Sequence, residues 1–249
     1  MKELITVKDL TRDYTMPNEE NGTIHVLKGL NFSIYENEFV GIMGKSGCGK
    51  TTLLKTLGLI DPPTAGELCF KGTSVKELWE DELSDIRRRN LGFVFQDFYL
   101  MDSLTLEENI MLPMILDKKE EKDCYESARL YAEHFQISHL LKKYPFEISG
   151  GEKQRTAICR ALVNHPDLIL ADEPTGNLDS ASGRIVVEAL ENIHQNMKKT
   201  IVMVTHDPQV ASHCDRILFL KDGLILEDAR KESTTEDFYQ YILSRMSDL

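Results

Sequence analysis

The sequence predicts an α/β fold in which a parallel sheet presents a phosphate-binding loop. Residues 44–51 match the pattern G-x-x-x-x-G-K-[S/T], whose glycines let backbone N–H groups approach phosphates closely. Short apolar runs at 168–171 and 201–205 are separated by a helical stretch at 180–195. Because strands that alternate with helices build parallel sheets, we expect the nucleotide at the carboxyl edge of that sheet.

The N-terminal part of the chain predicts an antiparallel hairpin. Residues 4–7 and 24–34 alternate between apolar and polar side chains, as half-buried strands do. A polar, acidic stretch at 16–22 separates them and predicts a solvent-exposed tip.

The phosphate loop lies between a predicted strand and a predicted helix. Residues 38–43 are apolar and suit a buried strand, and residues 51–57 read as a helix that opens on the loop. The helix N-terminus then points its unpaired N–H groups and positive dipole end at the phosphates. Lys50 adds positive charge, and Thr51 offers a hydroxyl to Mg²⁺. The predicted nucleotide-binding residues of the loop are Gly44, Ser46, Gly47, Cys48, Gly49, Lys50, Thr51 and Thr52.

Cys48 stands inside this loop and has two interpretations. The five cysteines lack metal-ligand spacing, and an odd count suggests reduced thiols. A helix N-terminus lowers a thiol pKa, so alkylation of Cys48 would block nucleotide binding. Alternatively, Cys48 is a small residue that fills space.

Helical segments complete the chain. Helical periodicity at 106–116 and 125–135 predicts an inserted helical region. At the C-terminus, apolar residues recur at helical spacing after residues 233–235, a plausible cap, and predict a surface helix packed on the sheet domain.

Composition excludes several classes of protein. Hydrophobic residues make up 41% of the 249 residues and charged residues 28%, which is ordinary for a globular protein. No apolar run approaches the roughly 20 residues that span a bilayer, and the N-terminus lacks the apolar core of a signal peptide. We therefore expect a cytoplasmic chain. The formal charge of −12 argues against a nucleic-acid partner, and the basic cluster at 87–89 is expected to be a solvated helix end.

Two further motifs narrow the class, since a phosphate loop alone also occurs in kinases, GTPases and many ATPases. Residues 148–155 resemble the signature sequence of ABC ATPases, and residues 168–173 resemble their Walker B strand with its following glutamate. Gln96 resembles the Q-loop glutamine, residues 177–179 resemble the D-loop, and His206 resembles the switch histidine.

The resemblance extends from Tyr14 to about Gly223 and implies the architecture of the whole chain. It implies a P-loop NTPase (RecA-like) core with a parallel sheet, an N-terminal antiparallel β subdomain and an inserted α-helical subdomain. We expect one ABC ATPase domain over 1–249 with four segments. These are the catalytic core with the β subdomain (1–96 and 165–227), the helical subdomain with the signature (97–164) and a helical tail (228–249).

The resemblance also implies the catalytic roles, with ATP and Mg²⁺ as cofactors. Glu173 is expected to be the general base that polarises the attacking water, and His206 to contact the γ-phosphate. Asp172 closes a buried strand, where a carboxylate suits Mg²⁺. The predicted metal ligands are Thr51, Gln96 and Asp172. The predicted catalytic residues are Glu173, His206, Gln96 and Lys50.

A second phosphate-binding terminus is expected at the signature, because Ser149 and Gly151 begin a predicted helix. In ABC ATPases this terminus closes over the ATP of a second copy in a head-to-tail dimer. Tyr14 resembles the aromatic residue that stacks on adenine. The predicted nucleotide contacts outside the loop are Tyr14, Gln96, Ser149, Gly150, Gly151, Asp179 and His206. The sequence departs from the usual pattern at Lys45, in place of proline, and at 152–153, in place of a glutamine-rich pair.

Residues 171–179, 92–96 and 108–113 resemble one branch of the family, the lipoprotein-release, macrolide-export and bacitracin-resistance systems. This implies an ATPase on the inner face of the cell membrane that drives a separate permease, for antimicrobial-peptide resistance or for amphiphile or lipoprotein export. The alternatives are a cell-division ATPase that controls wall hydrolases, an importer subunit, and a soluble ABC ATPase acting on DNA or ribosomes. The acidic composition and the compact interval between the phosphate loop and the signature disfavour the last.

Overall fold

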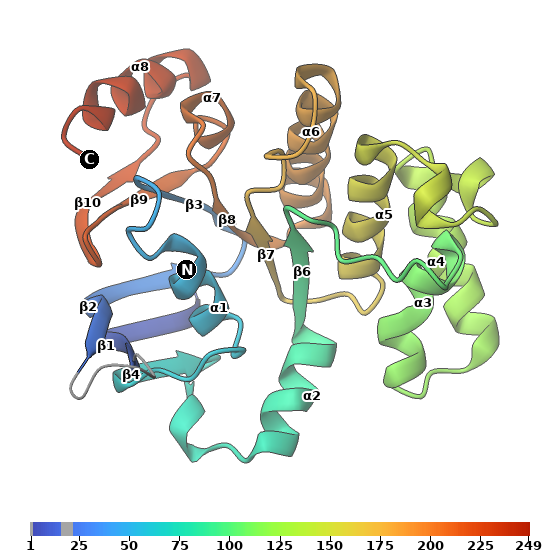
Figure 1. The fold of residues 1–249 in the computed structure, drawn as a ribbon, viewed down its shortest axis with the longest axis horizontal. Coiled ribbons are helices and arrows are strands. Elements are labelled where there is room, and N and C mark those ends of the chain that lie inside the picture. Colours follow the sequence, from blue (N-terminus) through green and yellow to red (C-terminus); the bar gives the residue numbers. More distant parts are fainter. Residues whose placement is uncertain (1, 16–21) are drawn as a thin grey trace. The chain divides into compact units, whose positions relative to one another are not determined.

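The computed structural model describes residues 2–15 and 22–249. The chain forms two compact units, unit 1 (Met1–Leu83 and Thr200–Leu249) and unit 2 (Ser84–Lys199), whose elements are labelled in Figure 1.

Unit 1 holds an antiparallel sheet and a second, mainly parallel sheet. Its elements are β1 (Glu3–Thr15), β2 (Thr23–Tyr35), β3 (Phe39–Met43), α1 (Lys50–Leu57), β4 (Ala65–Phe70), β5 (Thr73–Ser74), a 3-10 turn (Val75–Glu77), β8 (Thr200–Val204), α7 (Pro208–Ala211), β9 (Arg216–Lys221), β10 (Leu224–Arg230) and α8 (Thr235–Met246).

The antiparallel sheet of unit 1 has the strand order β2-β1-β4-β5. Strands β1 and β2 form the predicted hairpin, with Val7 opposite Phe32 and Tyr14 opposite Ile24. The predicted tip at 16–22 lies outside the described residues except for Gly22. Strand β4, which the sequence analysis did not predict, pairs with β1 on the other side.

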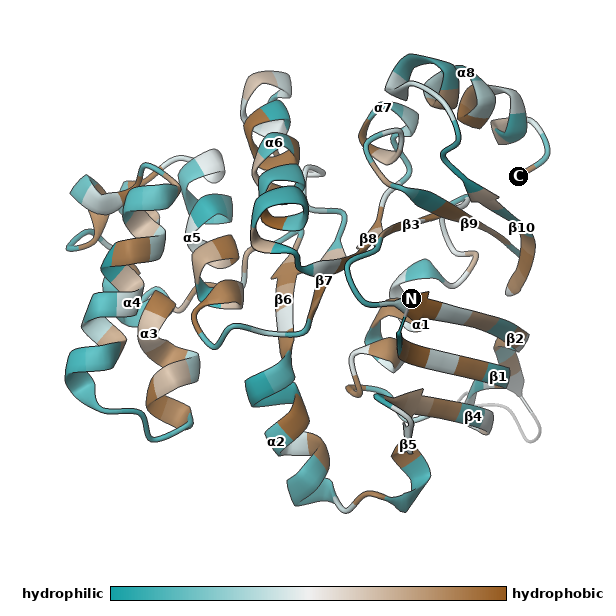
Figure 2. Ribbon diagram, turned by 180° about the vertical axis from the view of Figure 1, so that it is seen from behind, coloured by the Kyte–Doolittle hydropathy of each residue, from teal (hydrophilic) through white to brown (hydrophobic). Residues whose placement is uncertain are grey.

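The second sheet of unit 1 carries the phosphate loop. Strand β3 pairs in parallel with both β8 and β9, and β10 adds to β9 in antiparallel orientation. Every residue of β3 and of β8 is buried, which explains why both strands are continuous apolar runs. Figure 2 shows the hydrophobic residues of these strands in brown.

The C-terminal helix α8 belongs to unit 1 and begins where the sequence predicts. Thr234 is its N-cap, and its side chain accepts a hydrogen bond from the backbone N–H of Asp237. Phe238 and Ile242 are buried, so the apolar stripe of the helix packs against the unit.

Unit 2 combines a parallel strand pair with a group of helices. Its elements are most of α2 (Glu80–Asn90), β6 (Leu91–Phe95), α3 (Leu106–Leu116), α4 (Glu121–His134), two 3-10 turns (Ser138–Leu140 and Pro145–Glu147), α5 (Gly150–Leu162), β7 (Leu168–Asp172) and α6 (Ser180–Met197).

Strands β6 and β7 of unit 2 run parallel, with Phe95 opposite Asp172. Helix α5 packs against β6, α6 and the helical pair α3 and α4. A capping box at Thr105 begins α3, because its side chain and Glu108 satisfy each other's backbone N–H groups. Helix α2 differs from these helices: none of its residues, all within the described part of the chain, is buried.

The predicted α/β class is confirmed. The predicted strands and helices occur within a few residues of their expected bounds, except that the strand expected at 4–7 extends to Thr15 as β1. The exception to the parallel expectation is β10, which pairs antiparallel with β9. Among residues 2–15 and 22–249, the helices are too short or too polar to cross a lipid bilayer.

Candidate nucleotide-binding site

Strand β3 leads directly into the phosphate loop in unit 1. A Cβ atom at Gly44 would lie 2.2 Å from the carbonyl oxygen of Leu220 and 2.5 Å from the Cys48 sulfur. Only a glycine fits this close approach of the loop to strand β9. At the other end of the loop, Gly49 has a φ of 105° and is the N-cap of α1. The left-handed conformation of Gly49 turns the chain into the helix, so that the N-terminus of α1 opens on the loop.

The Lys50 ammonium group lies inside the loop. Its Nζ donates to the carbonyl oxygens of Gly44 at 2.8 Å and Lys45 at 3.0 Å. Ser46, Gly47 and Thr51 are exposed around it. A positive charge held within a glycine-rich loop at a helix N-terminus suits the phosphates of a nucleotide.

The expectation that the helix N-terminus lowers the Cys48 pKa is wrong. Burial raises the pKa of the Cys48 thiol, and the opposing effect of the Lys50 charge does not overcome it. Only 6% of Cys48 is exposed. Since its sulfur fills the space that a side chain at Gly44 would need, the interpretation of Cys48 as a packing residue is the one that the structure supports.

His206 lies at the same edge of the sheet as the phosphate loop. Strands β3 and β8 are neighbours, with Ile42 opposite Val204, so the segments after both strands lie side by side. The Thr205 hydroxyl accepts from the backbone N–H of Asp207 at 3.1 Å, which shapes the turn that carries His206. The His206 side chain is exposed at this edge. Unit 1 thus brings the predicted γ-phosphate contact to the carboxyl edge that carries the loop.

Tyr14, the predicted adenine contact, lies on β1 in unit 1. The Arg12 guanidinium stands over its ring at 4.5 Å, and the Tyr14 hydroxyl donates to Asp61 at 2.9 Å. These contacts fix the ring and cover one of its faces with a cation.

In unit 2, the pairing of β6 with β7 places Gln96 and Asp172–Glu173 at one sheet edge, since Phe95 lies opposite Asp172. Glu173 has a φ of 46°, a left-handed conformation that is strained for a residue with a side chain. Such strain clusters at functional sites.

The oxygen donors of this edge suit Mg²⁺, which binds one or two carboxylates together with substrate phosphates. Within the described ranges 2–15 and 22–249, no three or more His, Cys, Asp or Glu side chains gather to hold a metal without a nucleotide. Of the predicted ligands, Gln96 and Asp172 lie in unit 2 and Thr51 lies in unit 1.

The predicted signature begins helix α5, with Ser149 as its N-cap. Ser149 and Glu152 form a capping box, so the glutamate that departs from the usual pattern has a structural partner. A Cβ atom at Gly151 would lie 2.9 Å from the Ser182 hydroxyl oxygen, so the start of α5 approaches the start of α6 closely. Gly150 faces Leu178 in the same junction.

Asp179 caps helix α6 in unit 2. Its Oδ1 accepts from the backbone N–H groups of Ala181 and Ser182, both at 3.0 Å, and the Ser182 hydroxyl donates to Oδ2 at 2.7 Å. These hydrogen bonds lower the pKa of Asp179. Sequence reasoning did not single out Gln154 as a site residue, although it is fully buried and donates to the carbonyl oxygens of Phe95 and Pro174. Gln154 lies within residues 148–155, which resemble the signature, and this position was the signal that could have identified it.

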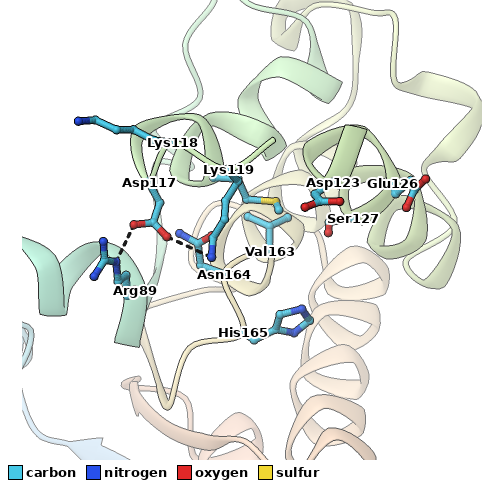
Figure 3. Close-up of a pocket in the computed structure, with 11 residues that line it drawn as sticks. Arg89, Asp117, Lys118, Lys119, Asp123, Glu126, Ser127, Val163, Asn164 and His165 are labelled. Atoms are coloured by element: carbon cyan, nitrogen blue, oxygen red, sulfur yellow. Dashed lines mark hydrogen bonds and ion pairs between the residues drawn. The ribbon is translucent and has the colours of Figure 1, made fainter. Parts of the chain in front are cut away.

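A cavity of about 790 Å³ in unit 2 contains none of the predicted site residues. Figure 3 shows Arg89 and Lys119 directed at the Asp117 carboxylate, with Asn164 and His165 nearby. The basic cluster at 87–89 is thus more than a solvated helix end, because Arg88 and Arg89 both pair with Asp117.

Comparison with known proteins identifies the family. Residues 27–176 match the model described as ABC transporter. The uncharacterized ABC transporter ATP-binding protein YvcR of Bacillus subtilis (strain 168) is 47% identical over 228 residues, 91% of this chain and 88% of that protein. The bacitracin export ATP-binding protein BceA of Halalkalibacterium halodurans is 43% identical over 219 residues, 88% of this chain and 87% of that protein.

A solved structure agrees with these relatives. It is the dimeric, post-hydrolysis state of the ATP-binding cassette MJ0796 bound to ADP and Pi, with a TM-score of 0.84 and 38% identity, covering 92% of this chain and 100% of that chain. The phosphate loop, the sheet edges that carry the predicted catalytic residues, and these relatives lead to one conclusion: the chain belongs to the ABC transporter family, as an ATP-binding subunit that hydrolyses ATP.

Proposed function

We propose that the chain drives a separate membrane permease that exports an antimicrobial peptide or another amphiphile. The observation that carries this proposal is its 43% identity to a bacitracin export ATP-binding protein across most of both chains. In this proposal the permease holds the exported molecule, and the chain works at the inner face of the membrane.

Within this function, Lys50 and the loop backbone bind the ATP phosphates, and Tyr14 binds the adenine. Glu173 accepts a proton from the attacking water, a contribution of roughly 10²- to 10⁴-fold to the rate. His206 holds the γ-phosphate for that attack.

Mg²⁺ is the proposed metal cofactor, held by the Thr51 hydroxyl, Gln96 and Asp172. When bound, the ion neutralises charge on the phosphates. The oxygen-only donor set supports this choice of metal.

The proposed active form contains two copies of the chain. The N-terminus of α5, with Ser149, Gly150 and Gly151, presents backbone N–H groups that suit a phosphate. The phosphates of one ATP are already bound by the phosphate loop, so this second terminus needs another ATP. In the proposed dimer this terminus and Asp179 close on the ATP of the second copy. The dimeric state of the solved cassette supports the arrangement.

The experiment is to purify a tagged Glu173→Gln variant from its native membranes with Mg-ATP and identify the co-purifying proteins by mass spectrometry. The variant retains ATP, so its complexes persist. A stoichiometric membrane permease supports the proposal. Ribosomal proteins or DNA without a membrane protein would overturn it. The matched control is Glu188→Gln, which removes an exposed carboxylate that pairs with Arg184 on the same helix, α6.

A further inference from the structure

The Asn177 side chain makes three hydrogen bonds within unit 2, one of them with the Gln96 side chain. The Gln96 amide nitrogen Nε2 donates to Asn177 Oδ1 at 3.1 Å. Asn177 Nδ2 in turn donates to the backbone carbonyl oxygen of Gln96 at 3.2 Å and to the Asp97 carboxylate at 2.8 Å. One side chain therefore contacts both the backbone and the amide of the residue predicted to bind the metal.

The direction of these bonds determines how the Gln96 amide is oriented. Both partners of Asn177 Nδ2 are acceptors, the Gln96 carbonyl oxygen and the Asp97 carboxylate, so the NH₂ group of Asn177 must face them. The amide oxygen of Asn177 then faces the Gln96 side chain, where the NH₂ group is the part of the amide that can donate to it. The Gln96 NH₂ group is consequently drawn to Asn177, and the carbonyl oxygen of the Gln96 amide lies on the opposite side of the amide group.

The backbone on each side of this contact is also fixed. A Cβ atom at Gly176 would lie 2.9 Å from Gln96 Nε2, so a larger residue beside Asn177 would push the amide out of this position. Gln154 donates from one amide nitrogen to the Phe95 carbonyl oxygen at 3.3 Å and to the Pro174 carbonyl oxygen at 2.8 Å. It thereby ties the residue before Gln96 to the turn that leads to Asn177.

We propose that Asn177 is a positioning residue that makes the carbonyl oxygen of Gln96, rather than its NH₂ group, the end of the amide available to Mg²⁺. The inference rests on the proposed role of Gln96 as a metal ligand. Only an oxygen can ligate Mg²⁺, so a Gln96 amide that turns over would present two N–H donors to a cation. Partners that orient a metal ligand typically change metal affinity by about 10- to 100-fold when they are removed.

The experiment measures metal affinity rather than turnover. Binding of MANT-ATP, a fluorescent ATP analogue, is titrated with Mg²⁺ in the hydrolysis-deficient Glu173→Gln background. Asn177→Ala should raise the Mg²⁺ concentration for half-maximal tightening by about 10-fold or more. Binding of MANT-ATP without Mg²⁺ should be unchanged, which also shows that the variant is folded.

A charge-swapped variant separates orientation from loss of structure. In Asn177→Asp with Asp97→Asn, residue 177 accepts from residue 97 and still accepts from Gln96 Nε2, while the bond to the Gln96 carbonyl oxygen is lost. Because the bond from Nε2 sets the orientation of the amide, the Mg²⁺ response should return part of the way to that of the parent. Asn177→Asp alone places two carboxylates together and should not recover it. Asn196→Ala removes an exposed amide on α6 and is the matched control.

An Asn177→Ala protein with the Mg²⁺ response of its parent would overturn the inference and leave the proposed function intact. A parent protein whose MANT-ATP binding ignores Mg²⁺ would overturn the proposed metal role together with the inference. An equal loss in Asn177→Ala and in the charge-swapped variant would also overturn it, because orientation would then not be the cause.

Discussion

The hydroxyl of Ser149 donates a hydrogen bond of 2.6 Å to the carboxylate of Glu152, one turn into helix α5. The same carboxylate oxygen accepts from the backbone N–H of Ser149 at 2.8 Å. These two hydrogen bonds from Ser149 lower the pKa of Glu152, so the carboxylate is ionised at neutral pH. A negative charge therefore lies at a helix N-terminus that is proposed to receive a phosphate.

Glu152→Gln tests the cost of that charge to nucleotide binding. The glutamine oxygen can accept both hydrogen bonds from Ser149, so the cap is kept while the repulsion of phosphate is removed. We expect the KM for ATP to fall about two- to fivefold, the size of effect typical of an exposed charge. Loss of the acid at the helix N-terminus should cost about 0.3–1 kcal/mol of stability. ATPase assays at low and high salt measure the difference, which should shrink as salt screens the charge.

An unchanged KM at low salt would contradict this expectation and place the Glu152 charge away from the bound phosphate. Glu188→Gln, which removes an exposed charge on α6, is the control for a general change in net charge.

Asp117 predicts a pH dependence of stability in unit 2. The hydrogen bond from Arg89 has the largest effect and lowers the pKa of Asp117 below the usual 3.8. Burial opposes it, and Arg88 and Lys119 lower the pKa further. A carboxylate with a lowered pKa in the folded state stabilises that state above its unfolded-state pKa, and the stabilisation is lost as pH falls through the folded-state pKa. The unfolding free energy of Asp117→Asn should therefore lie below that of the natural chain at pH 7, and the difference should shrink below pH 3.8. Urea unfolding from pH 7 to pH 3 measures it, and a constant difference would show that the ion pairs do not carry the effect.

Cys48 should resist alkylation although it lies in the nucleotide loop. Thiolates are the reactive form, and burial raises the Cys48 pKa and also limits access to a thiol that is 6% exposed. Cys69 is half-buried and should react first with iodoacetamide at pH 7.5, even though burial raises its pKa as well. Peptide mass spectrometry over time gives both rates. Modification of Cys48 as fast as Cys69 would contradict the assignment of Cys48 as a packing residue.

The parts of the site that the sequence predicts are those set by local patterns. The loop glycines, the strand at 38–43 and the helix at 106–116 follow from spacing and periodicity that neighbouring residues supply. The parallel pairing of β3 with β8 then follows from the alternation of strands and helices along the chain. This pairing is what places His206 beside the phosphate loop.

The parts that sequence did not predict depend on contacts between distant segments. The lowered Cys48 pKa was expected from the helix N-terminus, but burial, which only the packed loop reveals, has the larger effect. The bonds between Gln96 and Asn177 join residues 81 positions apart, and no periodicity encodes them. Strand β10 reverses direction after a turn at Gly223, where φ is 80°. The local sequence signal for this turn is the Asp222–Gly223 pair.

Arg216 is the centre of a buried ion network in unit 1, and its removal should be the most destabilising of the changes considered. It is 4% exposed, as is Glu38, and the two side chains lie 3.3 Å apart. Its guanidinium also donates two hydrogen bonds of 2.6 Å to the Asp228 carboxylate. Arg216→Met keeps much of the side-chain volume but removes the buried partner of Glu38, which keeps its contacts with Arg230 at 3.2 Å and with the backbone N–H of Tyr35 at 3.1 Å. Breaking a buried pair in this way costs about 3–5 kcal/mol.

Urea unfolding of Arg216→Met, of Arg216→Met with Glu38→Met, and of Arg184→Met distinguishes the cause of that loss. The double variant removes the Glu38 carboxylate, so it should be more stable than the single variant if the weakened pairing of this buried charge is the main cost. Arg184 pairs with Glu188 on the exposed face of α6 at 3.8 Å, and its removal should cost no more than about 0.5 kcal/mol. A double variant less stable than Arg216→Met would mean that removing the Glu38 charge brings no gain. The network would then contribute through its hydrogen bonds and packing.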